Sequence, residues 1–387
     1  MARKLTAQEK ILRKLKRDKK KNLPYTIITL AITMILMIIF SVASEPPAIK
    51  VSEDKNTIFT ATMAGDVMMG RNVEYVTNRY GQDYLFRYVK PYLETSDYVV
   101  SNFEHPVVLQ DGYTKAEKYI HLKTSKESVE TLKDLNFSAV TLANNHSKDY
   151  GKRGLVDTLN TFEEVGLDTV GAGLNLEDAK KISYQTKNDV KVALLGFTDS
   201  YTKGARAREL RSGVLAADPE IFLPLINEAK MNADLVIVNV HWGQEYDNEA
   251  HPRQKEIAKA MVDAGADIIV GHHPHVLSSV EVYKDSVIFY SLGNFVFDQG
   301  WTRTRDSAIV QYKLQSNGKA KIEVTPLRIR EATPHPIGKL GYFHAQKIFR
   351  TLTKDTPNRD EWKIENGKLT YELDHSNILK EVAISGK

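Results

Sequence analysis

The sequence predicts a layered α/β domain preceded by one membrane-spanning helix. Two observations lead to this fold class. Every residue from Asn22 to Ser44 is uncharged, and most of this stretch is apolar. From Thr57 to about Glu331, short runs rich in β-branched and apolar residues alternate with amphipathic stretches, the pattern of layered α/β folds. With 387 residues, 42% of them hydrophobic, the chain can bury a sizeable core.

The N-terminal segment has the composition of a basic tail followed by an anchor. Residues 1–22 contain ten Lys or Arg against two acidic residues, a net charge of +8, so the rest of the chain carries 4 − 8 = −4. As a helix, the uncharged stretch would span roughly 34 Å, enough for a hydrocarbon core of about 30 Å. We predict a basic cytoplasmic tail at 1–22 and a transmembrane anchor at 23–44. A cleaved signal peptide is the alternative, because Ser41-Val42-Ala43 has the small residues of a peptidase site.

The distribution of charge predicts the topology and the class of partner. Basic residues flank only the N-terminal side of the anchor, which places the N-terminus in the cytoplasm and the C-terminal domain outside the cell membrane in a single-pass arrangement. Because the remainder of the chain is net acidic, we expect no nucleic-acid partner. The absence of cysteine excludes disulfides, thiolate zinc sites and cysteine nucleophiles.

The elements after the anchor follow in order. A stalk is expected at residues 45–56, which include a Pro pair and show no clear period. The predicted strands are Thr57–Met63, Tyr98–Phe103, Ala139–Ala143, Val190–Phe197, Leu235–Val240, Ile268–Val270, Val287–Ser291, Ala308–Leu314 and Lys319–Ile329. The predicted helices are Ser125–Leu135, Gly154–Val165, Pro219–Met231, Pro252–Ala264 and Gly341–Leu352. We expect one domain over 57–332 and a C-terminal extension over 333–387.

Polar side chains follow several of these strands where each strand ends. In layered α/β sheets the strand–helix loops converge at that edge, so the residues are expected to meet there. They are carboxylates, amides and imidazoles without sulfur, a donor set suited to Mn, Fe, Zn or Mg. The candidate metal ligands are Asp66, Glu104, Asn145, His241, His272 and His275.

Such a donor set suggests a pair of divalent cations that activate water. His146 is the candidate catalytic residue, because it follows Asn145 directly and could donate a proton to a leaving group. His273 is left open between a structural role and a role in the site.

The motifs around these residues resemble a known family. They read Ala64-Gly65-Asp66-Val67-Met68-Met69-Gly70-Arg71, Asn102-Phe103-Glu104, Ala143-Asn144-Asn145-His146, His241-Trp242-Gly243-Gln244-Glu245, Gly271-His272-His273-Pro274-His275-Val276 and Tyr290-Ser291-Leu292-Gly293-Asn294-Phe295. Together they resemble the capsule biosynthesis proteins of the CapA/PgsA type over about Asn56 to Ala332. The resemblance implies an α/β/β/α metallophosphatase-like sandwich. It also implies a role as a membrane-anchored component of poly-γ-glutamate synthesis and export, with other synthase subunits and the polymer as partners.

The resemblance further implies roles for individual residues. Asp66 would be the first carboxylate ligand, Glu104 the bridging acid, and His146 the proton donor. Two positions depart from the metallophosphatase pattern, because Met68 stands where a His is usual and Glu104 where an Asp is usual. A thioether is a poor ligand for a hard divalent ion, so one cation would lose a donor. The site could therefore hold a single metal or none.

Two other functions remain open at this point. The outer domain could be a metal-dependent hydrolase that acts on a phosphoester, or on an amide or ester of the polymer. It could also be a scaffold that has lost its chemistry.

Binding of a polyanion by an acidic domain requires a local basic patch. Arg303 and Arg305 are the candidate polymer-binding residues. A loop with Lys203, Arg206, Arg208 and Arg211 is the alternative.

Overall fold

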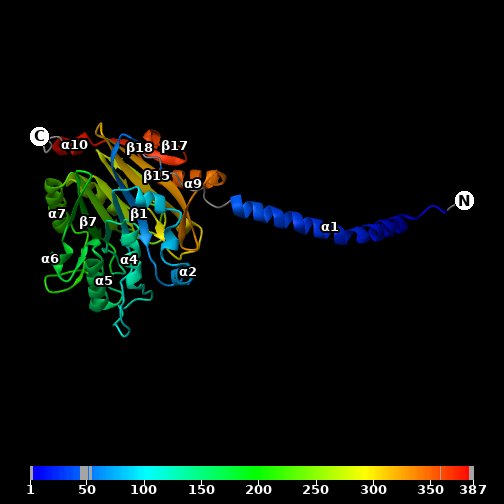
Figure 1. Ribbon diagram of the computed structural model, residues 1–387, viewed down its shortest axis with the longest axis horizontal. Helices are drawn as coiled ribbons and strands as arrows, with labels where there is room; N and C mark the ends of the chain where they lie inside the picture. Colours follow the sequence, from blue (N-terminus) through cyan, green and yellow to red (C-terminus); the bar gives the residue numbers. More distant parts are fainter. Residues whose placement is uncertain (1–2, 44–50, 52–54, 358, 383–387) are drawn as a thin grey trace. The chain divides into compact units, whose positions relative to one another are not determined.

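The computed structural model describes residues 3–43, 51, 55–357 and 359–382. The chain divides into two compact units, one up to Pro47 and one from Ala48 onward, which we call the head. The first unit contains helix α1 (Ala7–Ala43) and the head contains the α/β fold (Figure 1). Most of the predicted stalk, at residues 45–50 and 52–54, lies outside the described residues, as does residue 44 at the end of the predicted anchor.

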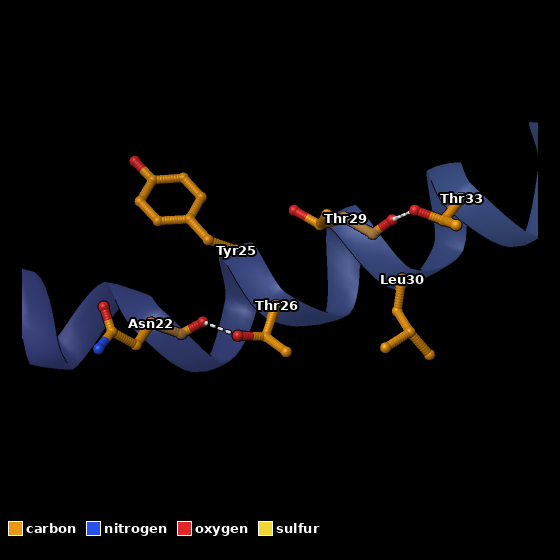
Figure 2. Close-up of a pocket in the computed structure, with 6 residues that line it drawn as sticks. All are labelled: Asn22, Tyr25, Thr26, Thr29, Leu30 and Thr33. Carbon is orange, nitrogen blue, oxygen red and sulfur yellow. Dashed lines mark hydrogen bonds between the residues drawn. The ribbon is translucent and has the colours of Figure 1, made fainter.

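Helix α1 runs without interruption through the predicted tail and the predicted anchor. Its apolar part has a mean hydropathy of 2.0 over 18 residues, none of it buried, so its length and composition would allow it to cross a membrane. The hydroxyls of Thr26 and Thr33 each donate to the carbonyl one turn earlier, at 2.8 Å (Figure 2). These hydroxyls need no outside partner, which suits an apolar environment.

The larger sheet of the head has ten strands among the described residues. Their order is β17 (Lys363–Glu365), β18 (Lys368–Asp374), β15 (Lys319–Arg330), β14 (Asp306–Gln315), β1 (Thr57–Val67), β2 (Tyr98–Phe103), β3 (Ala139–Thr141) and β4 (Asp168–Val170), with β13 (Asn294–Val296) beside β1 and β16 (Thr333–Pro336) beside β15. From β1 to β4 the strands are parallel, so their carboxyl ends share one edge.

A second sheet has six strands in the part of the head that is described. Their order is β11 (Val280–Tyr283), β12 (Ser286–Phe289), β10 (Ile268–His272), β9 (Leu235–His241), β7 (Val190–Thr198) and β6 (Ser183–Lys187), and a short ribbon pairs β5 (Ala172–Gly173) with β8 (Gly213–Val214). The four strands from β7 to β12 in the middle of this sheet are also parallel.

Side-chain alternation sorts the core into three layers. In β7, Val192 and Leu194 belong to the cluster between the two sheets, whereas Ala193 and Leu195 belong to the cluster beneath the outer helices of the second sheet. This is the period of two expected for a strand buried on both faces. A third cluster lies between the first sheet and its own helices. The head is therefore an α/β/β/α sandwich, and the predicted fold class is confirmed.

Helices cover the outer faces of both sheets (Figure 1). Those packed in the cluster on the first sheet include α4 (Lys126–Asp134) and α5 (Gly151–Val165), and those on the second include α7 (Pro219–Asn232) and α8 (Pro252–Asp263). The remaining helices of the head are α2 (Val73–Tyr80), α3 (Lys90–Glu94), α6 (Leu176–Ala179), α9 (Tyr342–Leu352) and α10 (Ser376–Val382), with single 3₁₀ turns η1 (Asp83–Phe86), η2 (Arg303–Arg305), η3 (Lys339–Gly341) and η4 (Arg359–Glu361). Every strand and helix expected in the head forms, with ends that differ by a few residues.

The C-terminal residues predicted as an extension join the fold of the head. Strand β16 pairs with β15, and β18 continues the sheet beyond β15. Helix α9 contributes Ile348 and Phe349 to the cluster between the sheets. The boundary at residue 333 thus falls inside the compact unit that begins at Ala48.

Candidate metal centre

The predicted ligands lie together where the carboxyl ends of both sheets meet. The carboxylate of Asp66, at the end of β1, lies 3.0 Å from His272 Nδ1 and 3.2 Å from His275 Nδ1, so it connects one sheet to the other. Across the strand pair in the second sheet, His272 is the direct neighbour of His241. His241 Nε2 lies 3.1 Å from Asn145 Oδ1. The carboxylates and imidazoles of this cluster are buried.

Glu104 occupies the middle of this cluster. Its Oε1 lies 3.6 Å from His275 Nε2 and 3.9 Å from His241 Nε2. Two groups of side chains, each with ligand atoms within 4.8 Å of one another, could hold a metal ion, and Glu104 belongs to both. One group adds Asp66 and His275, and the other adds His241 and His273. This is the position that a bridging carboxylate would have.

The two adjacent histidines of the Gly271-His272-His273 run have different surroundings. Both ring nitrogens of His272 are engaged, Nδ1 with Asp66 and Nε2 with Asn239 Oδ1 at 2.9 Å. The Nδ1 of His273 is buried without a hydrogen-bond partner, while its Nε2 lies 3.1 Å from Ser200 Oγ. His272 therefore orients Asp66, whereas His273 has a ring nitrogen free to bind a cation.

The backbone of this loop explains how two adjacent histidines can make different contacts. His273 has a φ of 96° and His275 a φ of 56°, both in the left-handed region that non-glycine residues rarely adopt. Such strained conformations gather at functional sites. The strand before the loop passes Gly271, where a Cβ would lie 2.1 Å from the carbonyl oxygen of Tyr290, so only glycine fits.

Burial sets the protonation of the imidazoles. It lowers the pKa of His241 well below its usual range and that of His273 to about 3, which leaves both rings neutral and able to bind a cation. Burial also raises the pKa of Glu104 well above its usual range. For Asp66, hydrogen bonds from His272 and His275 outweigh the opposing effect of burial and hold the pKa well below the usual range.

A buried acceptor shows that these residues fit a cation. Glu104 Oε1 is buried and makes no hydrogen bond. A buried carboxylate oxygen without a donor is costly, and a bound cation would satisfy it together with His273 Nδ1. The oxygen and nitrogen donors match borderline and hard divalent ions.

His146 lies beside this cluster with a polar network behind it. Its Nδ1 lies 2.7 Å from Asp149 Oδ2 and 2.9 Å from Lys118 Nζ. Lys118 also pairs with Asp149 and donates to the carbonyl of Asn145 at 3.0 Å. Because Nδ1 faces this network, Nε2 is the ring nitrogen left for a substrate. Burial lowers the pKa of His146, although the charge of Asp149 opposes the change.

Several residues of the site were not predicted. Asn102 donates to Asp66 at 2.9 Å and to Glu104 at 3.1 Å, and Asn294 accepts from His275 at 2.9 Å. Both residues pair with Asp66 across adjacent strands, so their positions in the sequence could have indicated that they lie in the site. Lys118 lies on the irregular loop between β2 and α4, where no periodicity could have indicated it.

Three further positions that the sequence analysis named are Met68, Arg305 and Arg303. Met68, which stands where the metallophosphatases have a His, turns its sulfur to the backbone N–H of Gly70 at 3.3 Å. Arg305, the predicted polymer-binding residue, donates to the carbonyl of Ile329 at 2.8 Å, on β15. Arg303 is exposed on η2.

Comparison with known proteins identifies the family. Residues 60–299 match the model of the bacterial capsule synthesis protein PGA_cap. The chain is 54% identical to the PGA biosynthesis protein CapA of Bacillus subtilis (strain 168), over 98% of this chain and all of that one. It is 50% identical to the capsule biosynthesis protein CapA of Bacillus anthracis, over 99% and 94% of the two chains.

Solved structures give weaker matches. The NAD nucleotidase of Haemophilus influenzae has a TM-score of 0.41 at 13% identity, over 84% of this chain and 66% of that one. A 5'-nucleotidase precursor from Thermus thermophilus has a TM-score of 0.40 at 12% identity, over 72% and 56%. The family model matches more than half of the chain, and two relatives that are at least 50% identical are covered almost fully. The chain therefore belongs to the bacterial capsule synthesis protein family.

Proposed function

We propose that this protein is a membrane-anchored component of the machinery that synthesises and exports poly-γ-glutamate. The observation that carries the proposal is the 54% identity to the PGA biosynthesis protein CapA of Bacillus subtilis across nearly the whole of both chains. The partners would be other synthase subunits and the polymer, to which Arg303 and Arg305 would bind.

The head would work outside the cell membrane, held there by α1. The apolar part of α1 supports anchoring, and the ten basic residues on its N-terminal side favour a cytoplasmic N-terminus. The uncharged span would thus separate a cytoplasmic tail from an extracytoplasmic head.

A divalent cation, with Mn, Fe, Zn and Mg as candidates, would bind in the head. Asp66, Glu104 and His275 would hold one ion, and Glu104 with His241 and His273 a second. Asn145 would add an amide oxygen beside His241. Such ions stabilise developing negative charge and lower the pKa of bound water. His272 is better suited to orienting Asp66 than to binding an ion, because both of its ring nitrogens have partners.

A second candidate function is a metal-dependent hydrolase, and the surroundings of His146 favour it. In this case His146 would transfer a proton at Nε2 to or from the reacting group, while Asp149 and Lys118 fix the orientation of the ring. The substrate would be a phosphoester, or an amide or ester bond of the polymer.

Genetic replacement tests the first proposal. In a poly-γ-glutamate-producing bacterium that lacks its own capsule synthesis protein of this family, the full chain should restore polymer production. A chain without residues 1–44 should not restore it, because the head would leave the membrane. If the full chain reaches the membrane at normal abundance and produces no polymer, the proposed role is wrong.

Metal analysis and turnover test the second. The purified full chain should contain a divalent metal, and a hydrolase should cleave generic phosphodiesters or poly-γ-glutamate. The His146→Ala variant should then lose about 10² to 10⁴ in turnover while it keeps its metal. Bound metal without any turnover would exclude hydrolysis of these substrates and leave a binding role.

A further inference from the structure

A cluster of arginines lies on the surface of the head where η2 meets β15. Arg328 and Arg330 are two residues apart on β15, so their side chains share one face of the strand. Arg305 donates to the carbonyl of Ile329, the residue between them. We call Arg303, Arg305, Arg328 and Arg330 the arginine cluster.

The arginine cluster carries more positive charge than its surroundings neutralise. Arg328 pairs with Asp306, but this carboxylate also accepts from His344 at 2.7 Å and from Lys347 at 3.0 Å. Within residues 55–357, no ion pair is formed by Arg303, Arg305 or Arg330. Burial and the charges of Arg328 and Arg330 lower the pKa of Arg305, a sign that like charges crowd here.

Further cationic and aromatic groups continue this surface. Arg87 lies 3.5 Å above the ring of Tyr84 and 4.4 Å from that of Tyr88. The ring of Tyr88 lies 4.2 Å from that of His335, on the strand beside β15, with the two ring planes tilted by 38°. Burial lowers the pKa of His335 to about 4, with further contributions from Arg330 and Arg87. The histidine thus stays neutral between two arginines that keep their charge.

Two aromatic rings connect the arginine cluster to the candidate metal centre. Arg328 Nη1 donates to the carbonyl of Thr302 at 2.8 Å, next to Trp301, whose side chain is 58% exposed. The Trp301 ring lies 5.6 Å from that of Tyr246, which lies 6.4 Å from that of His275. A series of aromatic contacts therefore runs from the exposed Trp301, beside the arginines, through the partly exposed Tyr246 to the buried predicted ligand His275.

We propose that the arginine cluster, with Arg87 and Trp301 at its borders, binds the poly-γ-glutamate chain and leads it toward the metal centre. This inference rests on the proposed function, and it adds the surface that binds the polymer and the direction in which the polymer is led. Crowded guanidinium groups without ion-pair partners are stabilised by carboxylates, which they bind in a two-pronged geometry, and a polyglutamate offers one carboxylate per residue. The chain outside residues 1–22 is net −4, so this surface is a local exception to an acidic body.

Polymer binding tests the inference directly. The probe is fluorescently labelled poly-γ-glutamate, titrated with the full chain in detergent while anisotropy is recorded. The variant is Arg303→Glu with Arg330→Glu, both exposed side chains. The matched control is Lys187→Glu with Lys191→Glu, which makes the same change of charge at two exposed positions of the β6–β7 hairpin. Melting temperatures check folding, and glutamine variants at the same positions replace any variant that does not fold.

We expect the Arg303 and Arg330 variant to bind the polymer about tenfold or more weakly and with a shallower salt dependence, and the control to change by less than about twofold. Equal weakening in both, or none in the first, would overturn the inference. So would equally tight binding of polyphosphate or of anionic lipid vesicles by the unaltered chain. These outcomes are independent of the capsule test, because failure of the full chain to restore polymer production refutes the proposed function whatever the binding result.

Discussion

Replacement of Glu104 by glutamine is the sharpest test of the candidate metal centre. Glu104 belongs to both groups that could hold an ion, whereas His241 and His275 belong to one each. Glutamine keeps the shape of the side chain and its hydrogen bond from Asn102 but removes the negative charge. Glu104→Gln should therefore weaken both cation sites at once, while His241→Ala and His275→Ala should each leave one.

The expected size of the effect follows from linkage. A ligand present at 100 times its dissociation constant stabilises the folded state by about 2.7 kcal/mol. For a domain of this size, about 2 °C of melting temperature per kcal/mol gives a rise of about 5 °C when metal is added. In the metal-free protein the substitution should cost little, because burial raises the pKa of Glu104 and already disfavours its charged form, and its Oε1 has no hydrogen bond to lose. The variant should thus match the unaltered protein in chelator and lose the rise in metal.

The assay combines thermal unfolding, with and without added Mn²⁺ or Zn²⁺, and elemental analysis of the full chain. Glu281→Gln is the control, since Glu281 is a buried acid that accepts from Tyr290 at 2.8 Å, away from the candidate ligands. This variant should keep the full response to metal. A Glu104→Gln protein with unchanged metal content and the same rise in melting temperature would refute the assignment of Glu104 as a shared ligand.

Three further outcomes are expected. His273→Ala should lower the metal content more than His272→Gln, because only His273 has an unpartnered ring nitrogen, and elemental analysis showing the reverse would contradict this assignment. Burial is the main cause that lowers the pKa of His335 to about 4, so the neutral ring adds stability to the folded state above its unfolded pKa of about 6.5, and this stability is lost as the pH falls toward 4. His335→Gln should therefore flatten the fall of the melting temperature between these two pH values. An unchanged pH profile of the melting temperature would contradict this expectation. Protease added to intact protoplasts should digest the head, since α1 is expected to leave it outside, and protection of the head would reverse the topology.

Most of the fold was predictable because the buried strands can be recognised by their apolar composition. The run Val190–Thr198, for example, has nearly continuous apolar residues, as a strand covered on both faces must. The strands β17 and β18 were not predicted. The edge strand β17 is exposed throughout, and β18, next to it, has exposed positions, so polar residues such as Lys363 and Glu372 occupy them. Their pairing depends on β15, which is distant in the sequence.

The sequence was sufficient to predict which strand ends form the candidate site, but not the contacts within it. Parallel neighbours place Asp66 and Glu104 at one edge, so their meeting follows from topology. The choice between His272 and His273 depends on the left-handed backbone at the second residue and on which ring nitrogens have partners, and a strand pattern indicates neither. Lys118 reaches His146 from an irregular loop, and no local pattern encodes that contact.

The continuity of α1 has a consequence for how its basic part is oriented relative to its uncharged span. Its residues before the uncharged span, from Ala7 to Lys21, form about 22 Å of helix in register with the span, because each residue adds about 1.5 Å and about 100° of rotation. Ile11, Leu12 and Leu15 lie exposed on this segment, so the rotation of the span fixes the direction in which they point. One alanine inserted after Asn22 would turn these three side chains by about 100° relative to the span, whereas an insertion of seven, close to two full turns, would nearly restore their phase. A partner that binds these three side chains would respond differently to the two insertions, although both insertions lengthen the helix.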